Sequence, residues 1–448
     1  MIKIAIPRAA REILATLHQA GYEAYIVGGC VRDALLQREP DDWDITTNAD
    51  PVRIKQLFSR TVDTGLQHGT VTVLKDKTGY EVTTYRVDGA YKDHRRPDTV
   101  TFTSDLKEDM LRRDFTINAM AYNEEEGLVD HFHGQEDLKL GVIRCVGDAK
   151  KRFDEDALRV LRALRFAAQL DFQIEEATLE AMKEKAVYLK DISAERIRVE
   201  LTKLLCSKHP ECLLTIGYPT GITSLLMPWF DDMLRTTQEN PHHCYDVGRH
   251  TMKAVCQVDN SVVLRFAALL HDVGKPKCKT IDEEGVAHFY NHGSVGASMA
   301  QQILRELKFD NDTIKKVHNL VYWHDYRWGD KVSKRIVRRA AAKIGMDDMQ
   351  DIFALQRADV LAQSQFLQIE KLQLLDAIKV CYSEIEEEQQ CVTIGQLAIG
   401  GQELIAAGMK PGREIGDMLQ FLLDQVIEQP EWNTKDKLME LVRAHHLS

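Results

Sequence analysis

The chain has 448 residues and a formal net charge of −11; 44% of its residues are hydrophobic and 28% are charged. This length exceeds a single hydrophobic core and predicts roughly three or four domains, in a composition ordinary for a globular protein. The acidic balance argues against a protein that merely coats nucleic acid, and the lack of an apolar run of about 20 residues excludes a membrane-spanning helix.

The nine cysteines stand singly, without a C-x-x-C pair. This pattern is typical of reduced thiols in a cytosolic protein rather than of a disulfide framework or a zinc cluster. Residues 1–10 lack an uninterrupted apolar stretch followed by a small-residue cleavage site, so no signal peptide is expected. The predicted location is therefore cytoplasmic.

Helix and strand patterns alternate in the first part of the chain, and helix patterns dominate the rest. Apolar periodicity predicts a helix over residues 8–20, and the apolar stretch 24–27 predicts a strand that runs into a Gly-Gly turn. Further strands are expected at residues 69–74, 80–86 and 100–102. From about residue 150 the strand patterns cease. Helices are then predicted over residues 154–170, 177–190 and 195–205.

The expected fold class is α+β, with a small mixed-sheet head followed by an almost entirely α-helical body. Composition and pattern changes place the boundaries near residues 145, 215 and 385. We therefore predict a head over residues 1–145, a helical neck over 146–215, a third domain over 216–385 and a helical tail over 386–448.

Two carboxylates follow a Gly-Gly turn in the head. The segment GGCVRD at residues 28–33 precedes Asp42 and Asp44. In an extended strand, residues two apart point to the same face, so these aspartates would lie side by side and suit two Mg²⁺ ions. Glu81, between apolar residues of another strand, would complete a catalytic site. The glycines would let backbone N–H groups approach a triphosphate, which Arg32 would neutralise.

A second head signature reads RRDFTINAMA at residues 112–121. Together with the Gly-Gly turn and the paired aspartates, it resembles the nucleotidyltransferase superfamily, and specifically the bacterial-type (class II) CCA-adding enzyme and poly(A) polymerase family. The resemblance implies a polymerase β-like head in which Asp42 and Asp44 hold Mg²⁺. It further implies that Gly29, Arg32 and Arg113 contact the nucleotide. Asp114 and Asn118 would lie near the ribose, where a 2′-OH can be read.

The neck opens with EDALRVLRALRF at residues 155–166. On one helix, Asp156 and Arg159 would share a face, and Arg162 and Arg165 would continue the spacing. An ordinary helix with weak ion pairs is one interpretation. The segment also matches the family's E-D-x-x-R signature, which implies that Asp156 and Arg159 read the base of the incoming nucleotide, with Arg162 and Arg165 assisting through base or phosphate contacts. G and U, with a donor pattern opposite to that of C and A, would leave these groups unpaired.

Between the head strands, residues 88–97 are polar and contain glycine, proline and a basic cluster. They resemble the flexible loop of family members that add A, which members adding only C largely lack. The alternative is a surface loop that touches the phosphate backbone. In the tail, the glycines of residues 394–423 resemble the C-terminal region of CCA-adding enzymes and imply tRNA binding, while a plain helix cap and turn is the alternative.

The third domain carries the H…HD…D pattern of HD phosphohydrolases. Imidazoles and carboxylates on separate helices can converge on a divalent ion, here Mn, Ni, Co, Fe or Mg, and two further histidines suit a second ion. In some CCA-adding enzymes such a domain hydrolyses phosphate esters at RNA ends. The alternative is a degenerate fold that only shapes the RNA-binding body. The expected ligands are His250, His271, Asp272, His292, His324 and Asp359.

These patterns predict template-independent addition of C and A to tRNA 3′ ends from CTP and ATP, with release of pyrophosphate. An enzyme that adds only A, and a poly(A) polymerase, would share the head and much of the neck. A third alternative, from another class, is an HD phosphohydrolase with an inactive RNA-binding head. The expected partners are the tRNA 3′ end, CTP and ATP, and no membrane; the patterns do not predict an oligomeric state.

Overall fold

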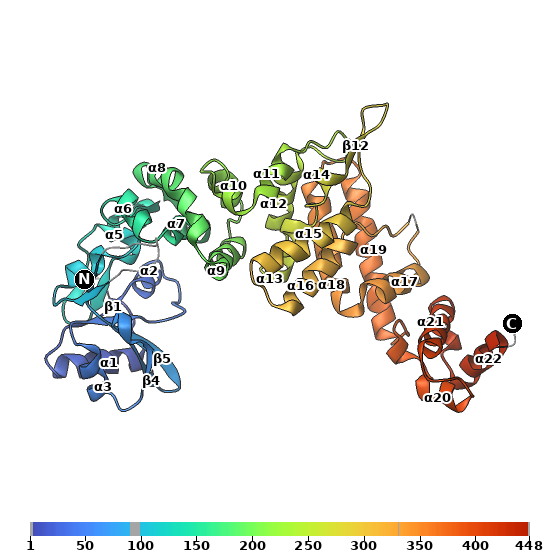
Figure 1. Cartoon of the computed structure of the whole chain (residues 1–448), viewed down its shortest axis with the longest axis horizontal. Helices are drawn as coiled ribbons and strands as arrows, with labels where there is room; N and C mark the ends of the chain where they lie inside the picture. Colours follow the sequence, from blue (N-terminus) through green and yellow to red (C-terminus); the bar gives the residue numbers. More distant parts are fainter. Residues whose placement is uncertain (1–2, 90–98, 330, 447–448) are drawn as a thin grey trace. The chain divides into compact units, whose positions relative to one another are not determined.

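The structure is a computed structural model, and it describes residues 3–89, 99–329 and 331–446. The chain forms two compact units, residues 1–231 and residues 232–448. In Figure 1 the first unit runs from the blue N-terminus to green, and the second runs from green to the red C-terminus. Within the described residues, no helix is long and apolar enough to cross a membrane.

A mixed sheet forms the centre of the head. Its described strands follow the order β3-β4-β5-β2-β1-β8-β9, in which β2 and β5 run parallel while the other neighbours are antiparallel. The mixed sheet and the helical remainder confirm the predicted α+β class. The strands are β1 (Ala24–Val27), β2 (Ile45–Thr47), β3 (Thr61–Gly65), β4 (Thr70–Lys75), β5 (Thr78–Thr84), β8 (Ala121–Asn123) and β9 (Gly127–Val129).

A separate antiparallel hairpin, β6 (Arg86–Asp88) and β7 (Val100–Phe102), lies on either side of residues 90–98. The loop predicted at residues 88–97 to distinguish A-adding enzymes therefore lies largely outside the described residues. The helix predicted at residues 8–20 is α1 (Arg8–Gln19), which packs on β1 and β2. It buries Ile13 and Leu17 completely, as its apolar spacing requires.

The helices of the first unit follow the predicted pattern with two differences. The helix expected over residues 154–170 is broken at Asp156, and the one expected over 177–190 ends at Lys185 and continues as a 3₁₀ segment to Asp191. The remaining helices of this unit are α2 (Gly29–Leu35), α3 (Pro51–Leu57), α4 (Leu106–Leu111), α5 (Gly134–Leu140), α6 (Ala149–Glu155), α7 (Leu158–Leu170), α8 (Glu176–Lys185), α9 (Ala194–Leu205) and α10 (Ile222–Leu226).

Helix α7 is buried around most of its circumference. It packs against α9, and Arg159 and Arg165 are buried together with its leucines. Because a buried charge is costly unless it is paired, the guanidinium groups of α7 need partners from neighbouring segments. After α7, the short strand β11 (Gln173–Ile174) pairs in parallel with β10 (Val142–Ile143), so strand structure does not cease at residue 150 as the sequence pattern indicated.

In the described residues of the second unit, the regular structure is helical apart from the hairpin of β12 (Lys279–Ile281) and β13 (Ala287–Phe289). Its most apolar helix, α13, packs against α12, α16 and α18, which places the residues that follow α13 inside the unit. The helices are α12 (Val247–Gln257), α13 (Val262–Leu270), α14 (Lys275–Cys278), α15 (His292–Glu306), α16 (Asn311–Trp323), α17 (Lys334–Ile344), α18 (Met346–Ala362), α19 (Gln368–Glu387), α20 (Gly401–Ala406), α21 (Arg413–Glu428) and α22 (Lys435–His446).

Candidate active site and second-unit histidine cluster

The paired carboxylates of the head lie immediately before β2 rather than on it. The backbone N–H of Val27 donates to the carbonyl oxygen of Asp44 at 3.0 Å, which continues the β1–β2 pairing by one residue. On the other side, Ile45 pairs with Val82 in parallel register, so Asp44 lies beside Glu81. Since Ile45 and Val82 are buried and side chains alternate, Asp44 and Glu81 project from the opposite face of the sheet.

The electrostatics of this face favour a cation. Burial and, after it, the neighbouring charges of Asp42 and Glu81 raise the pKa of Asp44 to about 6, although Arg113 opposes them. A divalent cation relieves the repulsion between neighbouring carboxylates, and hard ions such as Mg²⁺ prefer oxygen ligands. The arrangement therefore fits the predicted Mg²⁺ site. Within the described residues, the oxygen atoms of these three carboxylates do not all lie within 4.8 Å of one another, whereas the ligand atoms of two groups of side chains in the second unit do.

The glycine turn brings the backbone close to an arginine. Gly28 has a φ of +83°, and a Cβ at this position would lie 3.1 Å from Nη1 of Arg113. Glycine is required here because another residue would be strained and would crowd the guanidinium group. Gly29 begins α2, which carries Arg32 one turn later. The predicted triphosphate contacts Gly29, Arg32 and Arg113 are thus neighbours in the structure.

Arg32 and the second head signature form one hydrogen-bonded chain. Arg32 donates through Nε and Nη2 to the two carboxylate oxygens of Asp33, at 2.9 and 2.7 Å, and through Nη1 to Oδ1 of Asn118 at 2.7 Å. Asn118 donates to Oδ1 of Asp114 at 3.1 Å, and Arg162 donates through Nε to Oδ2 of Asp114 at 2.7 Å. Burial alone would raise the pKa of Asp114, but Arg162 and Asn118 hold it well below its usual value.

The predicted base-reading pair is arranged differently from the sequence expectation. Asp156 has extended backbone angles between α6 and α7, and its carboxylate accepts from the N–H of Leu158 at 3.1 Å and from Arg196 at 2.8 Å. Asp156 and Arg159 therefore do not share a face of one helix, because the aspartate lies before the start of the helix that carries the arginine.

Arg159 is buried and held by three oxygen atoms. It donates through Nη1 to Oε2 of Glu155 at 2.8 Å and to the carbonyl oxygen of Arg152 at 3.0 Å, and through Nη2 to the carbonyl oxygen of Arg112 at 2.8 Å. Arg165 lies one turn beyond Arg162 on α7, and its Nε is 2.8 Å from Oε2 of Glu200. No sequence motif pointed to Glu200, on α9, because its contact with Arg165 arises only from the packing of α9 on α7.

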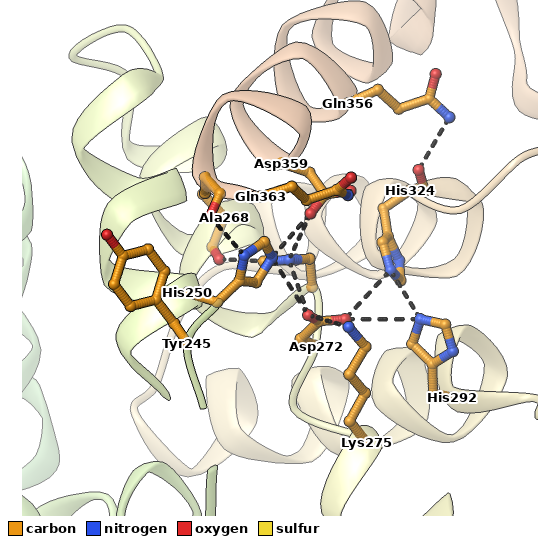
Figure 2. A network of polar contacts seen from close by, with 12 residues as sticks. Tyr245, His250, Ala268, Asp272, Lys275, His292, His324, Gln356, Asp359 and Gln363 are labelled. Atoms are coloured by element: carbon orange, nitrogen blue, oxygen red, sulfur yellow. Dashed lines mark hydrogen bonds and ion pairs between the residues drawn. The ribbon is translucent and has the colours of Figure 1, made fainter. Parts of the chain in front are cut away.

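In the second unit, the six predicted HD residues converge although they come from five helices or helix ends. Nε2 of His250 lies 2.8 Å from Oδ1 of Asp359, and Nε2 of His271 lies 3.2 Å from Oδ2 of Asp272. The other oxygen of Asp272 is 3.6 Å from Nε2 of both His292 and His324. Figure 2 shows Asp272 between His250 and the pair of His292 and His324.

The hydrogen bonds at the backs of the four imidazoles determine which nitrogen faces inward. Each Nδ1 lies 2.7–3.2 Å from a backbone carbonyl oxygen, which can only accept, so each Nδ1 carries the proton. In the neutral ring, Nε2 then presents a lone pair to the centre of the cluster. This is the arrangement of metal-binding histidines, whose second nitrogen is oriented by a hydrogen bond. The carbonyls belong to Ala362, Ala268, Phe289 and Val321.

The inward-facing atoms form two groups that meet at Asp272. One consists of His250, His271 and Asp272, and the other of Asp272, His292 and His324, and the ligand atoms in each lie within 4.8 Å of one another. The Nε2 atoms of His250 and His271 are buried and make no hydrogen bond in the described part of the chain. A cation would compensate these atoms, so the residues present fit one or two divalent ions.

A cavity of about 760 Å³ opens onto this cluster. Lys275 and Lys371 line it, and Nζ of Lys275 lies 2.7 Å from Oδ2 of Asp272. Lys371, from α19, donates to Oε1 of Gln363 at 2.6 Å, and Gln363 in turn donates to Oδ2 of Asp359 at 3.0 Å. Sequence reasoning missed Lys371, because no motif surrounds it and only the packing of α19 on α18 brings it here.

A mixed sheet with clustered carboxylates, beside a glycine turn and converging arginines, defines the first unit as a nucleotidyltransferase head with a helical extension. Three family models match the chain: residues 24–144 match the Poly A polymerase head domain, 171–234 the probable RNA and SrmB-binding site of polymerase A, and 281–442 the putative tRNA nucleotidyltransferase domain 2.

Relatives extend the likeness over the whole chain. The CCA-adding enzyme of Limosilactobacillus fermentum is 38% identical over 444 residues, which cover 97% of each protein. That of Levilactobacillus brevis is 37% identical over 433 residues, which cover 97% of this chain and 96% of that protein. The structure of the Bacillus stearothermophilus CCA-adding enzyme in complex with CTP matches with a TM-score of 0.70 at 26% identity, covering 98% of each chain. The chain therefore belongs to the bacterial-type (class II) CCA-adding enzyme and poly(A) polymerase family, and this membership implies a divalent metal, typically Mg²⁺.

Proposed function

We propose that Asp42, Asp44 and Glu81 form the catalytic centre with which this chain, as a CCA-adding enzyme, adds C and A to tRNA 3′ ends. The observation that carries the assignment is the carboxylate cluster around Asp44, whose pKa is raised to about 6 first by burial and then by its acidic neighbours. Mg²⁺ ions held there would stabilise the attacking and leaving oxygens as the tRNA 3′-hydroxyl displaces pyrophosphate from the α-phosphate.

The residues around this centre would bind and orient the nucleotide. The backbone of Gly29 and the guanidinium groups of Arg32 and Arg113 lie where a triphosphate would need neutralisation. Asn118 would approach the ribose. Asp114 already accepts from Asn118, from Arg162 and from the N–H of Phe115, so we assign it the role of holding these side chains rather than that of a direct nucleotide contact.

Asp156 and Arg159 would select the base. A carboxylate accepts from the amino group that C and A share, and a guanidinium group donates to ring or carbonyl acceptors. In the structure, Arg159 donates instead to Glu155 and to backbone carbonyls, and Asp156 accepts from Arg196. Base reading therefore requires these two side chains to give up their intramolecular partners for the nucleotide. With a wrong base they can keep those partners, so the free-energy cost of leaving that base unpaired is smaller.

Single-nucleotide incorporation tests the activity. Transcripts of tRNA ending in the discriminator base, in -C and in -CC are incubated with one labelled nucleotide at a time. We expect CTP to be used on the first two and ATP on the third, with GTP and UTP poorly used on all. Incorporation restricted to ATP on the -CC transcript would instead identify an enzyme that adds only A. Long A tails on unrelated RNA would identify a poly(A) polymerase.

For the second unit we propose a dinuclear HD site that hydrolyses a phosphate ester. The observation that favours it is the shared position of Asp272 between two groups of ligand atoms, beside the approach of Nε2 of His292 to Nε2 of His324 at 3.1 Å, where two lone pairs repel unless a proton or a metal ion is shared by them. Divalent ions would supply Lewis acidity and a water of lowered pKa. Lys275 and Lys371 would hold the phosphoryl group of a substrate in the adjacent cavity.

The shared position of Asp272 makes a specific prediction about metal content. After loading with Mn²⁺ and dialysis, Asp272→Ala should lose both ions, because this residue contributes to both groups of ligands. His292→Ala should lose only one. Metal per protein is measured by inductively coupled plasma mass spectrometry. His288→Ala is the matched control, because His288 lines the same cavity but pairs with Asp282. Wild-type metal content in Asp272→Ala would refute the site.

We retain the finer domain assignment as part of this proposal: head 1–145, neck 146–215, HD domain 216–385 and tRNA-binding tail 386–448. The tail has its own small core around Leu404, Leu422 and Leu438, which suits an independent role. A cytoplasmic location is proposed because tRNA and nucleoside triphosphates, the substrates of the family, are found there.

A further inference from the structure

The phenyl ring of Phe166 lies among three arginines in the described structure. The guanidinium carbon of Arg165 is 4.0 Å from the ring centroid, that of Arg32 is 5.0 Å away and that of Arg162 is 5.5 Å away. Phe166 itself is only 4% exposed. A cation within about 6 Å of an aromatic face is attracted by the ring quadrupole, and the attraction grows when the pair is shielded from water.

These arginines come from two parts of the first unit. Arg32 is on α2, in the head, whereas Arg162 and Arg165 are on α7, in the neck. Phe115, in the head, also meets the ring of Phe166 edge-on, with centroids 5.7 Å apart and an interplanar angle of 82°. Phe166 is therefore the side chain through which α7 contacts both the head core and the arginine that follows the glycine turn.

Acidic partners offset the repulsion between the three cations. Arg32 is paired with Asp33 at 2.7 Å, Arg162 with Asp114 and Arg165 with Glu200 at 2.8 Å. These pairs hold each guanidinium group through its nitrogen atoms, while its central carbon lies over the ring of Phe166. The side chain of Arg162 is still 34% exposed, compared with 11% for Arg32 and 8% for Arg165, so Arg162 is the one that remains most open to a ligand.

We propose that Phe166 is a positioning residue for nucleotidyl transfer, whose ring holds Arg32 and Arg162 at the place where the triphosphate binds. This inference rests on the proposed role of Arg32 as a triphosphate contact. Because CTP and ATP both carry a triphosphate, loss of the ring should weaken the binding of both nucleotides equally. Selection against GTP and UTP should be unchanged, since Asp156 and Arg159 are held by hydrogen bonds to other segments.

The test uses steady-state kinetics of the full-length enzyme on tRNA ending in -C or -CC. Phe166→Leu should raise KM for CTP and for ATP about tenfold, with kcat lowered less than threefold. Phe166→Tyr, which keeps the ring, should restore KM to within about twofold of wild type. Phe153→Leu is the matched control, because Phe153 is a fully buried ring on α6, and it should leave both KM values within about twofold.

A series of fluorinated phenylalanines at position 166 distinguishes the attraction between the ring and the guanidinium groups from the contribution of the ring to packing. Each fluorine weakens the ring quadrupole with little change of shape, so log KM should rise steadily with the number of fluorines. This series remains informative if Phe166→Leu fails to fold. A KM that does not change along the series would overturn the proposal, as would a loss of C and A selectivity in Phe166→Leu with unchanged KM.

Arg32→Ala distinguishes failure of this inference from failure of the proposed function. If Arg32→Ala leaves KM for both nucleotides unchanged, the triphosphate role of Arg32 is wrong and the Phe166 proposal falls with it. If Arg32→Ala raises KM while the fluorinated series does not, the nucleotide assignment stands and only the positioning role of Phe166 is refuted.

Discussion

Replacing Asp42 with alanine is expected to reduce nucleotidyl transfer by roughly 10³-fold or more. Removing a ligand of the proposed Mg²⁺ site forfeits several kcal/mol of transition-state stabilisation, and each 1.4 kcal/mol or so corresponds to a factor of ten in rate. The loss should appear in kcat rather than in tRNA affinity, because Asp42 is assigned to the Mg²⁺ site and tRNA binding is assigned to the tail. The measurement is single-turnover incorporation of labelled ATP on tRNA ending in -CC.

Asp41→Ala is the matched control for this variant, since Asp41 is an exposed carboxylate adjacent in sequence, and it should retain activity within about threefold. Asp42→Ala should also keep any phosphoesterase activity of the second unit at the wild-type level. Loss of both activities together would show that the two sites are not independent. Substantial transfer by Asp42→Ala would contradict the assignment of the catalytic centre.

Arg159→Ala is expected to relax base selection by about 10- to 100-fold. Discrimination arises because a wrong base leaves buried polar groups unpaired, at a cost of about 1–3 kcal/mol for each group. The quantity to compare is kcat/KM for CTP and ATP against kcat/KM for GTP and UTP, with all four measured on one preparation. This ratio is independent of the fraction of active enzyme, so destabilisation by loss of a buried arginine does not affect it.

Two further variants make the Arg159 experiment specific. Arg159→Lys keeps the charge but not the planar fork of donors, so it should also relax selection. Arg144→Ala removes an arginine of the same unit that pairs with Asp137 and Glu175, and it should leave selection unchanged. If Arg159→Ala selects C and A as strictly as the wild type, the base-reading role is refuted.

Local sequence patterns predicted much of the head. The apolar spacing of α1 and the apolar run of β1 ending at glycine identified both elements to within a residue or two. The short strand β8 was missed, because a three-residue strand is too short to show an alternating pattern. The paired aspartates were found by their spacing, but the strand was expected to include them and begins only at Ile45.

The neck shows the limit of helical periodicity. The spacing of Asp156, Arg159, Arg162 and Arg165 is that of one helix face, yet the helix begins at Leu158 and Asp156 lies outside it. An aspartate side chain can accept from backbone N–H groups, and here it does so at Leu158. This local hydrogen bond competes with helix continuation, and a periodicity count does not detect it.

The sequence by itself determined which residues are the candidates for the chemistry: the glycine turn, the head carboxylates, the arginine series and the histidines of the second unit. These are determined locally, because motifs record residue type and spacing along the chain. Only the tertiary structure decided their partners. The packing of α9 on α7 supplied Glu200, that of α19 on α18 supplied Lys371, and the tertiary fold brought Arg32 of α2 onto Phe166 of α7. Such contacts join residues that are far apart in sequence, and the burial that makes a charge need a partner exists only once the chain is folded.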